Sequence, residues 1–188
     1  MQESATDEEL MEAYRDGDAN AFEILYQRYR KPLFRYFQHQ CGSAAIAEEL
    51  FQDIWMNLIR ARQRYHVSAK FRTYIYRLAH NRLIDHYRKQ KHGIPASYDE
   101  NENTLATPAA ANTITPERTV SGMRQVDALL DAIDNLPEAQ REAFLLKENG
   151  DLSVEQIAEL TDVKPETAKS RVRYAINKLK QTLEPHHD

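Results

Sequence analysis

Cysteine is almost missing from this sequence. The 188 residues contain a single one, Cys41, so no disulfide can form within the chain. No pairing of cysteine and histidine at zinc-ligand spacing accompanies it. We therefore expect Cys41 to be an ordinary buried or half-buried thiol, and we expect no metal and no cofactor.

Long apolar runs are missing too. No stretch approaches the roughly 20 residues that a membrane-spanning helix needs. The first 20 residues are acidic and lack the apolar segment of a signal peptide. The sequence therefore predicts a protein of the cytoplasm.

The motifs of common catalytic sites are also absent. The sequence has no Walker loop, no nucleophile elbow and no cluster of carboxylates suited to a metal ion. We therefore expect no enzymatic activity and no small-molecule substrate.

Glycine is scarce, at 5 residues, whereas alanine, leucine, glutamate, arginine and glutamine are frequent. This composition favours helix over sheet. With 41% hydrophobic and 29% charged residues, the chain suits one or two small domains with modest cores. We predict an all-α fold.

The helical pattern divides the chain into two blocks. Residues 1–92 show repeated apolar spacing of the helical type, which Pro32 is expected to interrupt. Residues 93–122 have three prolines, many Asn, Thr and Ala residues and no apolar period, as is typical of a flexible linker. Helical spacing resumes over 123–188. The sequence therefore predicts two small helical domains joined by a linker.

Positive charge and aromatic rings gather at the end of the first block. The whole chain has a formal net charge of -4, yet residues 70–91 hold seven Lys or Arg residues and four aromatics against one acid. Aromatic faces that stack on bases, beside cations that hold the backbone, are typical of single-strand nucleic-acid binding. Helical spacing places Tyr74, Ile75 and Leu78 in the core and leaves Tyr76, Arg77 and His80 as the better candidates for DNA.

A helix-turn-helix is predicted near the C-terminus. Ser153 and Gln156 form a capping box that opens a short helix, and Pro165 suits the first position of a second one. From Lys164 to Lys180 there are six Lys or Arg residues and one acid, Glu166, on a helix whose other face is apolar. Such a helix fits the major groove of DNA. The alternative is an ordinary helical hairpin with a solvated basic face.

Both blocks together resemble extracytoplasmic-function (ECF) sigma factors of bacterial RNA polymerase. The segment "FRTYIYRLAHNRLIDHYRKQK" is similar to the second conserved region of that family, and "AEELFQDIWMNLIR" to its polymerase-binding helix. The segment "TAKSRVRYA" stands where the family's fourth region often has "TVKSRLSRA". The resemblance implies that residues 1–92 form region 2 and residues 123–188 form region 4.

The resemblance also implies a role for particular residues. Those expected to bind core RNA polymerase are Glu49, Leu50, Gln52, Asp53, Ile54 and Trp55. Those expected at the promoter −10 element are Ser68, Ala69, Lys70, Phe71, Tyr76, Arg77, His80, Asn81, Arg88 and Lys89. Those expected at the −35 element are Lys164, Glu166, Thr167, Lys169, Ser170, Arg171, Arg173 and Tyr174.

The implied partners are core RNA polymerase, through its largest subunits, promoter DNA, and an anti-sigma factor. Such anti-sigma factors are often tethered to the membrane, so the protein could be held at the inner membrane. Three alternatives stay open: a stand-alone helix-turn-helix regulator that dimerises, an enzyme acting on nucleic acid, and an RNA-binding protein.

Overall fold

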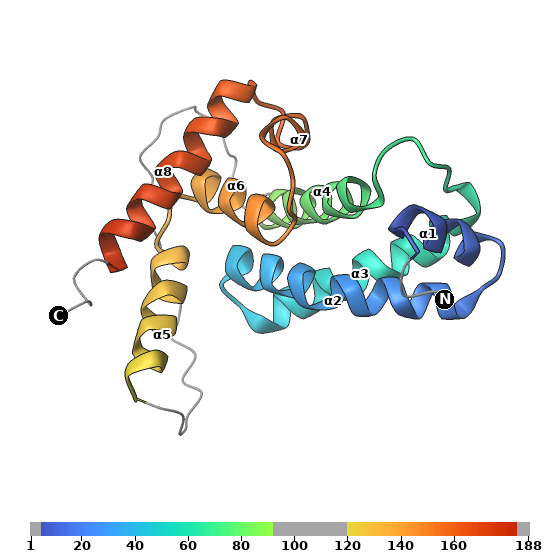
Figure 1. Cartoon of the computed structure of the whole chain (residues 1–188), viewed down its shortest axis with the longest axis horizontal. Coiled ribbons are helices and arrows are strands. Elements are labelled where there is room, and N and C mark those ends of the chain that lie inside the picture. The colour runs from blue at the N-terminus through green and yellow to red at the C-terminus, as the bar shows by residue number, and fades with distance from the viewer. Residues whose placement is uncertain (1–4, 92–119, 184–188) are drawn as a thin grey trace.

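The computed structural model describes residues 5–91 and 120–183, and these residues form helices and no strand. The elements are α1 Asp7–Arg15, α2 Ala19–Cys41, α3 Ala44–Ala61, the short 3₁₀ helix η2 Arg62–Arg64, α4 Phe71–Lys91, α5 Val120–Asp134, α6 Glu138–Glu148, α7 Val154–Leu160 and α8 Pro165–Leu183. Helices α1 to α4 form one bundle and α5 to α8 a second beside it (Figure 1). The all-α prediction is confirmed.

Local sequence signals account for the ends of α2. The Asp18 carboxylate accepts hydrogen bonds from the backbone N–H groups of Asn20 (2.9 Å) and Ala21 (3.4 Å). Two of the N–H groups that a helix start leaves without a partner are thereby satisfied. At the other end Gly42 adopts a left-handed conformation, with φ of 62°, and reverses the chain into α3.

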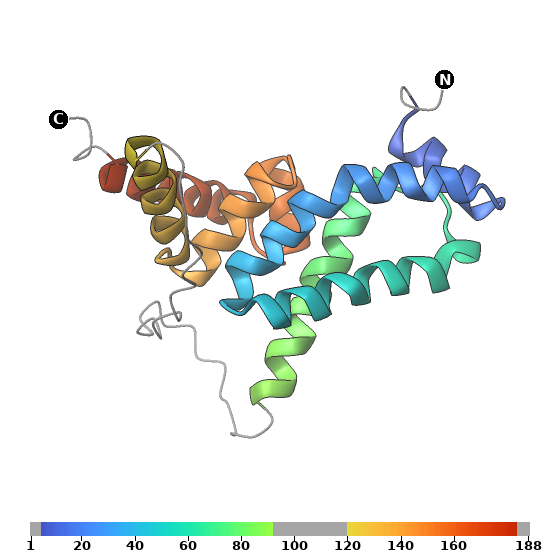
Figure 2. The same cartoon turned by 90° about the horizontal axis from the view of Figure 1, so that it is seen from below.

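The sequence led us to expect that Pro32 would interrupt this helix. It does not. The helix runs unbroken from Ala19 to Cys41, with Pro32 inside it. Proline removes one backbone donor and crowds the carbonyl four residues earlier. The packing of Tyr29, Leu33 and Phe37 into the core holds the helix together across this point. Helix α2 changes direction along its length (Figure 2).

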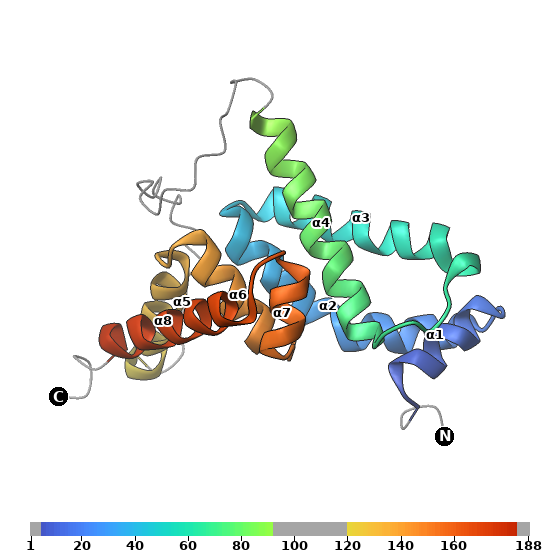
Figure 3. The ribbon, with the colours of Figure 1, turned by 90° about the horizontal axis from the view of Figure 1, so that it is seen from above.

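In the first bundle α2 and α3 lie side by side, and α4 crosses them (Figure 3). The core between them is made of fully buried side chains that include Leu33, Tyr36, Leu50, Ile54 and Ile75. Helix α4, which carries the basic and aromatic stretch, therefore has one face in the core of its own bundle.

The second bundle is built around α8, on which α5, α6 and α7 pack. Helix α5 begins at Val120, three residues before the predicted start of this block at residue 123. Most of the predicted linker, residues 93–119, lies outside the described residues. Nothing in the sequence pattern indicated how the two bundles would be placed. In the structure α2 and α4 of the first lie against α5, α6 and α7 of the second.

Candidate nucleic-acid interface

Helices α7 and α8 form the predicted helix-turn-helix. The Ser153 hydroxyl accepts from the backbone N–H of Gln156 (3.2 Å), and the Gln156 side-chain oxygen accepts from the backbone N–H of Ser153 (2.8 Å). The turn contains no glycine. Asp162 instead adopts the left-handed conformation, with φ of 54°, which aspartate tolerates better than most residues. Pro165 is the first residue of α8, as the sequence predicted.

Helix α8 buries one side and exposes the other. Ala168, Val172 and Leu179 are buried against the bundle. Of the side chains predicted at the −35 element, Ser170 and Arg171 are half-buried, and the exposed ones are Lys164, Glu166, Thr167, Lys169, Arg173 and Tyr174. The Arg173 guanidinium lies 5.2 Å from the centre of the Tyr174 ring, which is 52% exposed. This face therefore presents cations and one aromatic ring to solvent.

The loop that joins η2 to α4 is also exposed. Its residues Ser68, Ala69 and Lys70 are accessible, as predicted for a contact with the −10 element. Phe71, the next residue, is fully buried, with its ring 5.4 Å from that of Tyr29 and 6.3 Å from that of Tyr65. Phe71 is therefore not accessible in this structure, because its ring packs into the aromatic core below the loop, and its contact with DNA stays a prediction.

Tyr74 and Tyr76 of α4 reverse their expected positions. Tyr74 is half-buried, whereas Tyr76 is fully buried and donates a hydrogen bond to the backbone carbonyl of Asn149 (2.8 Å). Tyr76 is thus not accessible to DNA in this arrangement. Its ring packs edge-on against that of Tyr36 of α2 (5.8 Å), and its hydroxyl meets the second bundle, a contact that helical periodicity within α4 cannot foresee. Ile75 is core, as predicted, and Leu78 is half-buried.

Acidic residues of the second bundle contact Arg72, Arg77 and His80 of α4. Arg77 pairs with Glu159 (2.5 Å) and His80 with Glu142 (2.6 Å). Arg72 pairs with Asp151. Of the remaining −10 candidates, Asn81, Arg88 and Lys89 are exposed.

Glu142 is the most enclosed of these acids. Its side chain and that of His80 are each 14% exposed, and it also accepts a hydrogen bond from the Tyr36 hydroxyl (2.9 Å). Burial, followed by the negative charge of Glu142, raises the pKa of Tyr36 well above its ordinary value. Tyr36 therefore remains a protonated donor at neutral pH, and Glu142 ties α6 to both α2 and α4.

The predicted polymerase-binding residues divide between core and surface. Leu50, Ile54 and Trp55 are buried. Glu49 and Gln52 are exposed. Asp53 is half-buried and pairs with Arg82 of α4 (2.5 Å). The accessible part of this set is therefore polar.

Met56 is a surface residue that the sequence analysis missed. It is 45% exposed, which is unusual for a large apolar side chain, and it follows Asp53 by one helical turn. Helical spacing places the apolar residues of α3 in two rows, and Met56 belongs to neither, which was the available signal. The rows are Leu50, Ile54 and Leu58, and Ala47, Phe51, Trp55 and Ile59. Met56 adds an apolar contact to a polar surface, as protein interfaces often do.

Neither a metal site nor a membrane span is found among the described residues. In residues 5–91 and 120–183, no three His, Cys, Asp or Glu side chains are grouped as metal ligands. No helix in these ranges is both long and apolar enough to cross a bilayer.

Comparison with known families matches both bundles. The sigma-70 region 2 model matches residues 25–93, and the sigma-70 region 4 model matches residues 127–179. The RNA polymerase sigma factor CarQ of Myxococcus xanthus is 32% identical over 173 residues, which cover 92% of this chain and 95% of CarQ. The ECF sigma-E factor of Haemophilus influenzae is 28% identical over 98% of this chain and 99% of its own. The chain belongs to the ECF sigma factors.

Sigma factors direct the initiation of transcription by RNA polymerase, and they are not enzymes. This membership confirms the predicted family, function class and lack of enzymatic activity. It excludes the enzyme and the stand-alone regulator as descriptions of the chain.

Solved structures share the fold of this sigma factor. CnrH, in complex with the cytosolic domain of CnrY, has a TM-score of 0.65 at 16% identity, covering 96% of this chain and 99% of CnrH. RpoE of Bartonella quintana, in complex with the anti-sigma factor NepR, has a TM-score of 0.65 at 19% identity, covering 88% of this chain and 98% of RpoE. At these identities the likeness establishes the fold alone.

Proposed function

We propose that this sigma factor brings core RNA polymerase to its promoters by reading the −35 element with α8 and capturing the opened −10 strand with the η2–α4 loop and α4. The observation that supports this most directly is the exposed basic face of α8, the second helix of a helix-turn-helix whose first helix, α7, begins with a capping box. A helix of this kind enters the major groove, where base edges carry a distinguishable pattern of donors and acceptors.

On α8, Arg173 and Lys169 are exposed and can reach guanine edges or phosphates. Glu166 can accept from cytosine. Lys164, Thr167 and Tyr174 complete the accessible face, and the half-buried Ser170 and Arg171 flank it.

At the −10 element, two groups of residues act at different stages. Ser68, Ala69 and Lys70 lie on an exposed loop, the setting in which a flipped base is most readily taken up. Arg88 and Lys89 lie near the end of α4, where duplex phosphates are the expected partners. Arg77, His80 and Tyr76 can take part only after the second bundle has moved away.

The polymerase-binding surface consists of Glu49, Gln52, Asp53 and Met56 on α3. Leu50, Ile54 and Trp55 stabilise the helix from below. Carboxylates beside one exposed apolar side chain suit a basic, amphipathic helix of the polymerase.

The arrangement described here fits the free factor and not the promoter-bound one. The carboxylates of Glu142, Asp151 and Glu159 stand where the phosphates of a DNA strand would otherwise meet α4. A free factor in this closed arrangement binds promoter DNA weakly, and engagement of polymerase separates the two bundles.

An anti-sigma factor is the partner that we propose for regulation, because the solved structures with this fold include complexes with such proteins. It would act on this sigma factor in the cytoplasm, or hold it at the inner membrane if it is itself tethered there.

The test is transcription in a purified system. The protein is added to core RNA polymerase with a library of promoter fragments, and new transcripts are sequenced. We expect initiation from a subset that shares two elements, and no DNA selection by the protein alone. Tight selection of duplex without polymerase, with no new transcripts, would contradict the proposal.

A further inference from the structure

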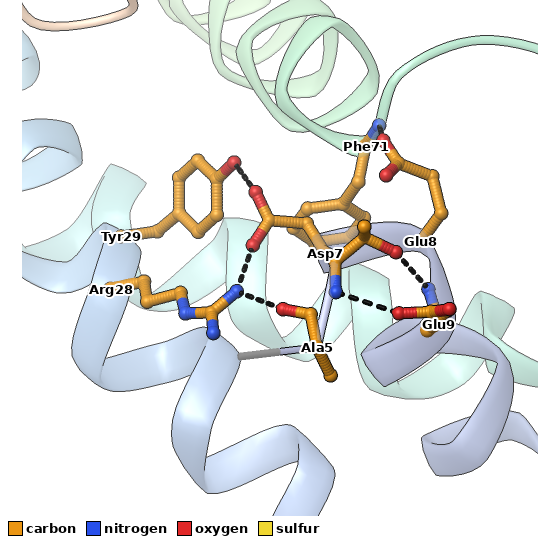
Figure 4. Close-up of polar contacts among 8 residues, drawn as sticks. Ala5, Asp7, Glu8, Glu9, Arg28, Tyr29 and Phe71 are labelled. Carbon is orange, nitrogen blue, oxygen red and sulfur yellow. Dashed lines mark hydrogen bonds and ion pairs between the residues drawn. The ribbon is translucent and has the colours of Figure 1, made fainter. Parts of the chain in front are cut away.

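The exposed loop before α4, residues 66–70, is held at both ends by α1. Before the loop, the backbone carbonyl of Tyr65 accepts a hydrogen bond from the Arg15 guanidinium (3.4 Å). After the loop, the backbone N–H of Phe71 donates to the Glu8 carboxylate (2.6 Å), as Figure 4 shows. One short helix therefore sets where this loop begins and where it ends.

The contact with Glu8 supplies something that the sequence around α4 lacks. The first N–H groups of a helix have no partner within the helix and need an acceptor. The residue before α4 is Lys70, whose side chain has only donors. Glu8 provides the acceptor from another helix, and its negative charge lies at the end of α4 where the helix dipole favours an anion.

Glu8 is itself held in place by its neighbours. The Asp7 carboxylate accepts from the Arg28 guanidinium (2.7 Å) and from the Tyr29 hydroxyl on α2. Arg28 also donates to the backbone carbonyl of Ala5 (2.9 Å). A capping box between Thr6 and Glu9 fixes the first turn of α1. Figure 4 shows these contacts converging beside the start of α4.

We propose that Glu8 is a positioning residue for promoter opening: through the N–H of Phe71 it fixes the loop that captures the −10 strand. The residues matched by the region 2 family model begin only at residue 25, so α1 lies outside that match. The inference rests on the proposed function, because it assigns a support to the −10 loop of that same site.

The experiment compares Glu8→Ala with Glu8→Gln, both in the full chain with core polymerase. The promoter is one selected by the library experiment above, with 2-aminopurine placed in the −10 element to report unpaired bases. We expect Glu8→Ala to lower the equilibrium constant for opening by about fivefold, the effect of losing one helix cap. Glu8→Gln keeps an acceptor for the Phe71 N–H and should recover most of that loss.

The matched control is Glu23→Gln, which removes an equal charge from an exposed position on α2. The Glu23 carboxylate contacts Gln27 of the same helix (2.7 Å) and lies outside the surfaces assigned above. It should open promoters as the unaltered protein does. Affinity for core polymerase and binding of a −35 duplex by the holoenzyme are measured for every variant and should not change.

Two results would overturn this role for Glu8. One is opening by Glu8→Ala equal to that of the unaltered protein. The other is an equal loss in opening, core affinity, −35 binding and thermal midpoint, which would indicate general destabilisation. If the unaltered protein gave no transcripts with core polymerase, the proposed function would fail before any variant was compared, and this role with it.

Discussion

At the scale of single residues, Arg173 offers the sharpest test of −35 recognition. It is exposed on α8 and stacked against the ring of Tyr174, which limits the directions that its guanidinium takes. If Arg173 contacts a base edge, Arg173→Ala should weaken binding of a −35 duplex by the holoenzyme by about 1–3 kcal/mol and relax the preference at one base position. Fluorescence anisotropy on a set of single-base variants measures both effects.

Lys169→Ala is the matched comparison on the same helix. A lysine that contacts only phosphate should weaken binding to every sequence alike and reduce the salt dependence. If Arg173→Ala behaved in that same uniform way, its assignment to a base edge would be wrong.

Cys41 yields a second prediction at this scale. Burial raises the pKa of its thiol to about 11, an effect that the nearby charge of Arg141 only partly opposes. The thiolate is the reactive form, and at pH 8 roughly 0.1% would be present at such a pKa. Alkylation by iodoacetamide should therefore be slow in the folded protein and rise about tenfold per pH unit up to about 11. Mass spectrometry over a pH series checks this; a fast, pH-independent reaction would contradict it.

Whether a side chain is buried or exposed was predictable from the sequence only where the contacts within a single bundle determine it. Ile75 is core in α4, as its spacing indicated, and Lys169 and Arg173 are exposed on α8. The burial of Tyr76 was not foreseen, because its hydroxyl is covered by the second bundle and its ring by Tyr36 of α2. The burial of Phe71 was not foreseen either, because it was counted with the loop before it, whereas its ring packs into the core.

Among the helices and turns, the capping box of α7 is the feature that the sequence predicted most clearly. Ser153 and Gln156 cap each other as predicted, and Gln156 also donates to the Thr73 hydroxyl of α4 (2.9 Å). Ser153→Ala should cost about 1 kcal/mol of stability. For a bundle of this size that corresponds to a fall of about 4–8 °C in thermal midpoint, which calorimetry can measure.

Ser153→Asp is the control for that change. Aspartate is as good an acceptor at this position, so the thermal midpoint should stay close to that of the unaltered protein. A fall as large as that of Ser153→Ala would show that the serine acts through packing and not as a cap.

Helix limits were harder to predict than caps. Pro32 is a breaker by its own chemistry, but α2 continues through it because the buried residues on either side share one core face. The family resemblance supplied the order of the helices. Neither the resemblance nor the periodicity contained the contact between the bundles, since that contact depends on polar pairs far apart in the chain.

For the whole molecule, the second bundle turns acidic side chains toward the basic helix α4 of the first. This arrangement explains why a DNA-binding protein can be acidic overall. The net charge is -4, but the acids Glu142, Asp151 and Glu159 lie opposite the cations of α4. The same carboxylates that lower the net charge would compete with DNA for α4. The closed arrangement and the weak DNA binding that we propose for the free factor would then have one cause.

Glu142→Ala should open this arrangement. It removes the acceptor of the Tyr36 hydroxyl and the partner of His80, and a buried polar group left without its partner costs about 1–3 kcal/mol. We expect a larger radius of gyration in small-angle X-ray scattering of the free protein, and tighter binding of single-stranded −10 DNA. Added salt should likewise enlarge the radius of gyration of the unaltered free protein, because the Arg77–Glu159 and Arg72–Asp151 pairs are exposed to screening.

Glu148→Ala is the control for this opening, because Glu148 is an exposed glutamate on the same helix. Both substitutions remove one negative charge and introduce the same helix-favouring residue, so only the contact at Glu142 differs between them. If the two variants had equal radii of gyration and bound the −10 strand equally, closure would have to depend on the apolar contacts between the bundles. The acids of the second bundle would then not be what keeps DNA from α4.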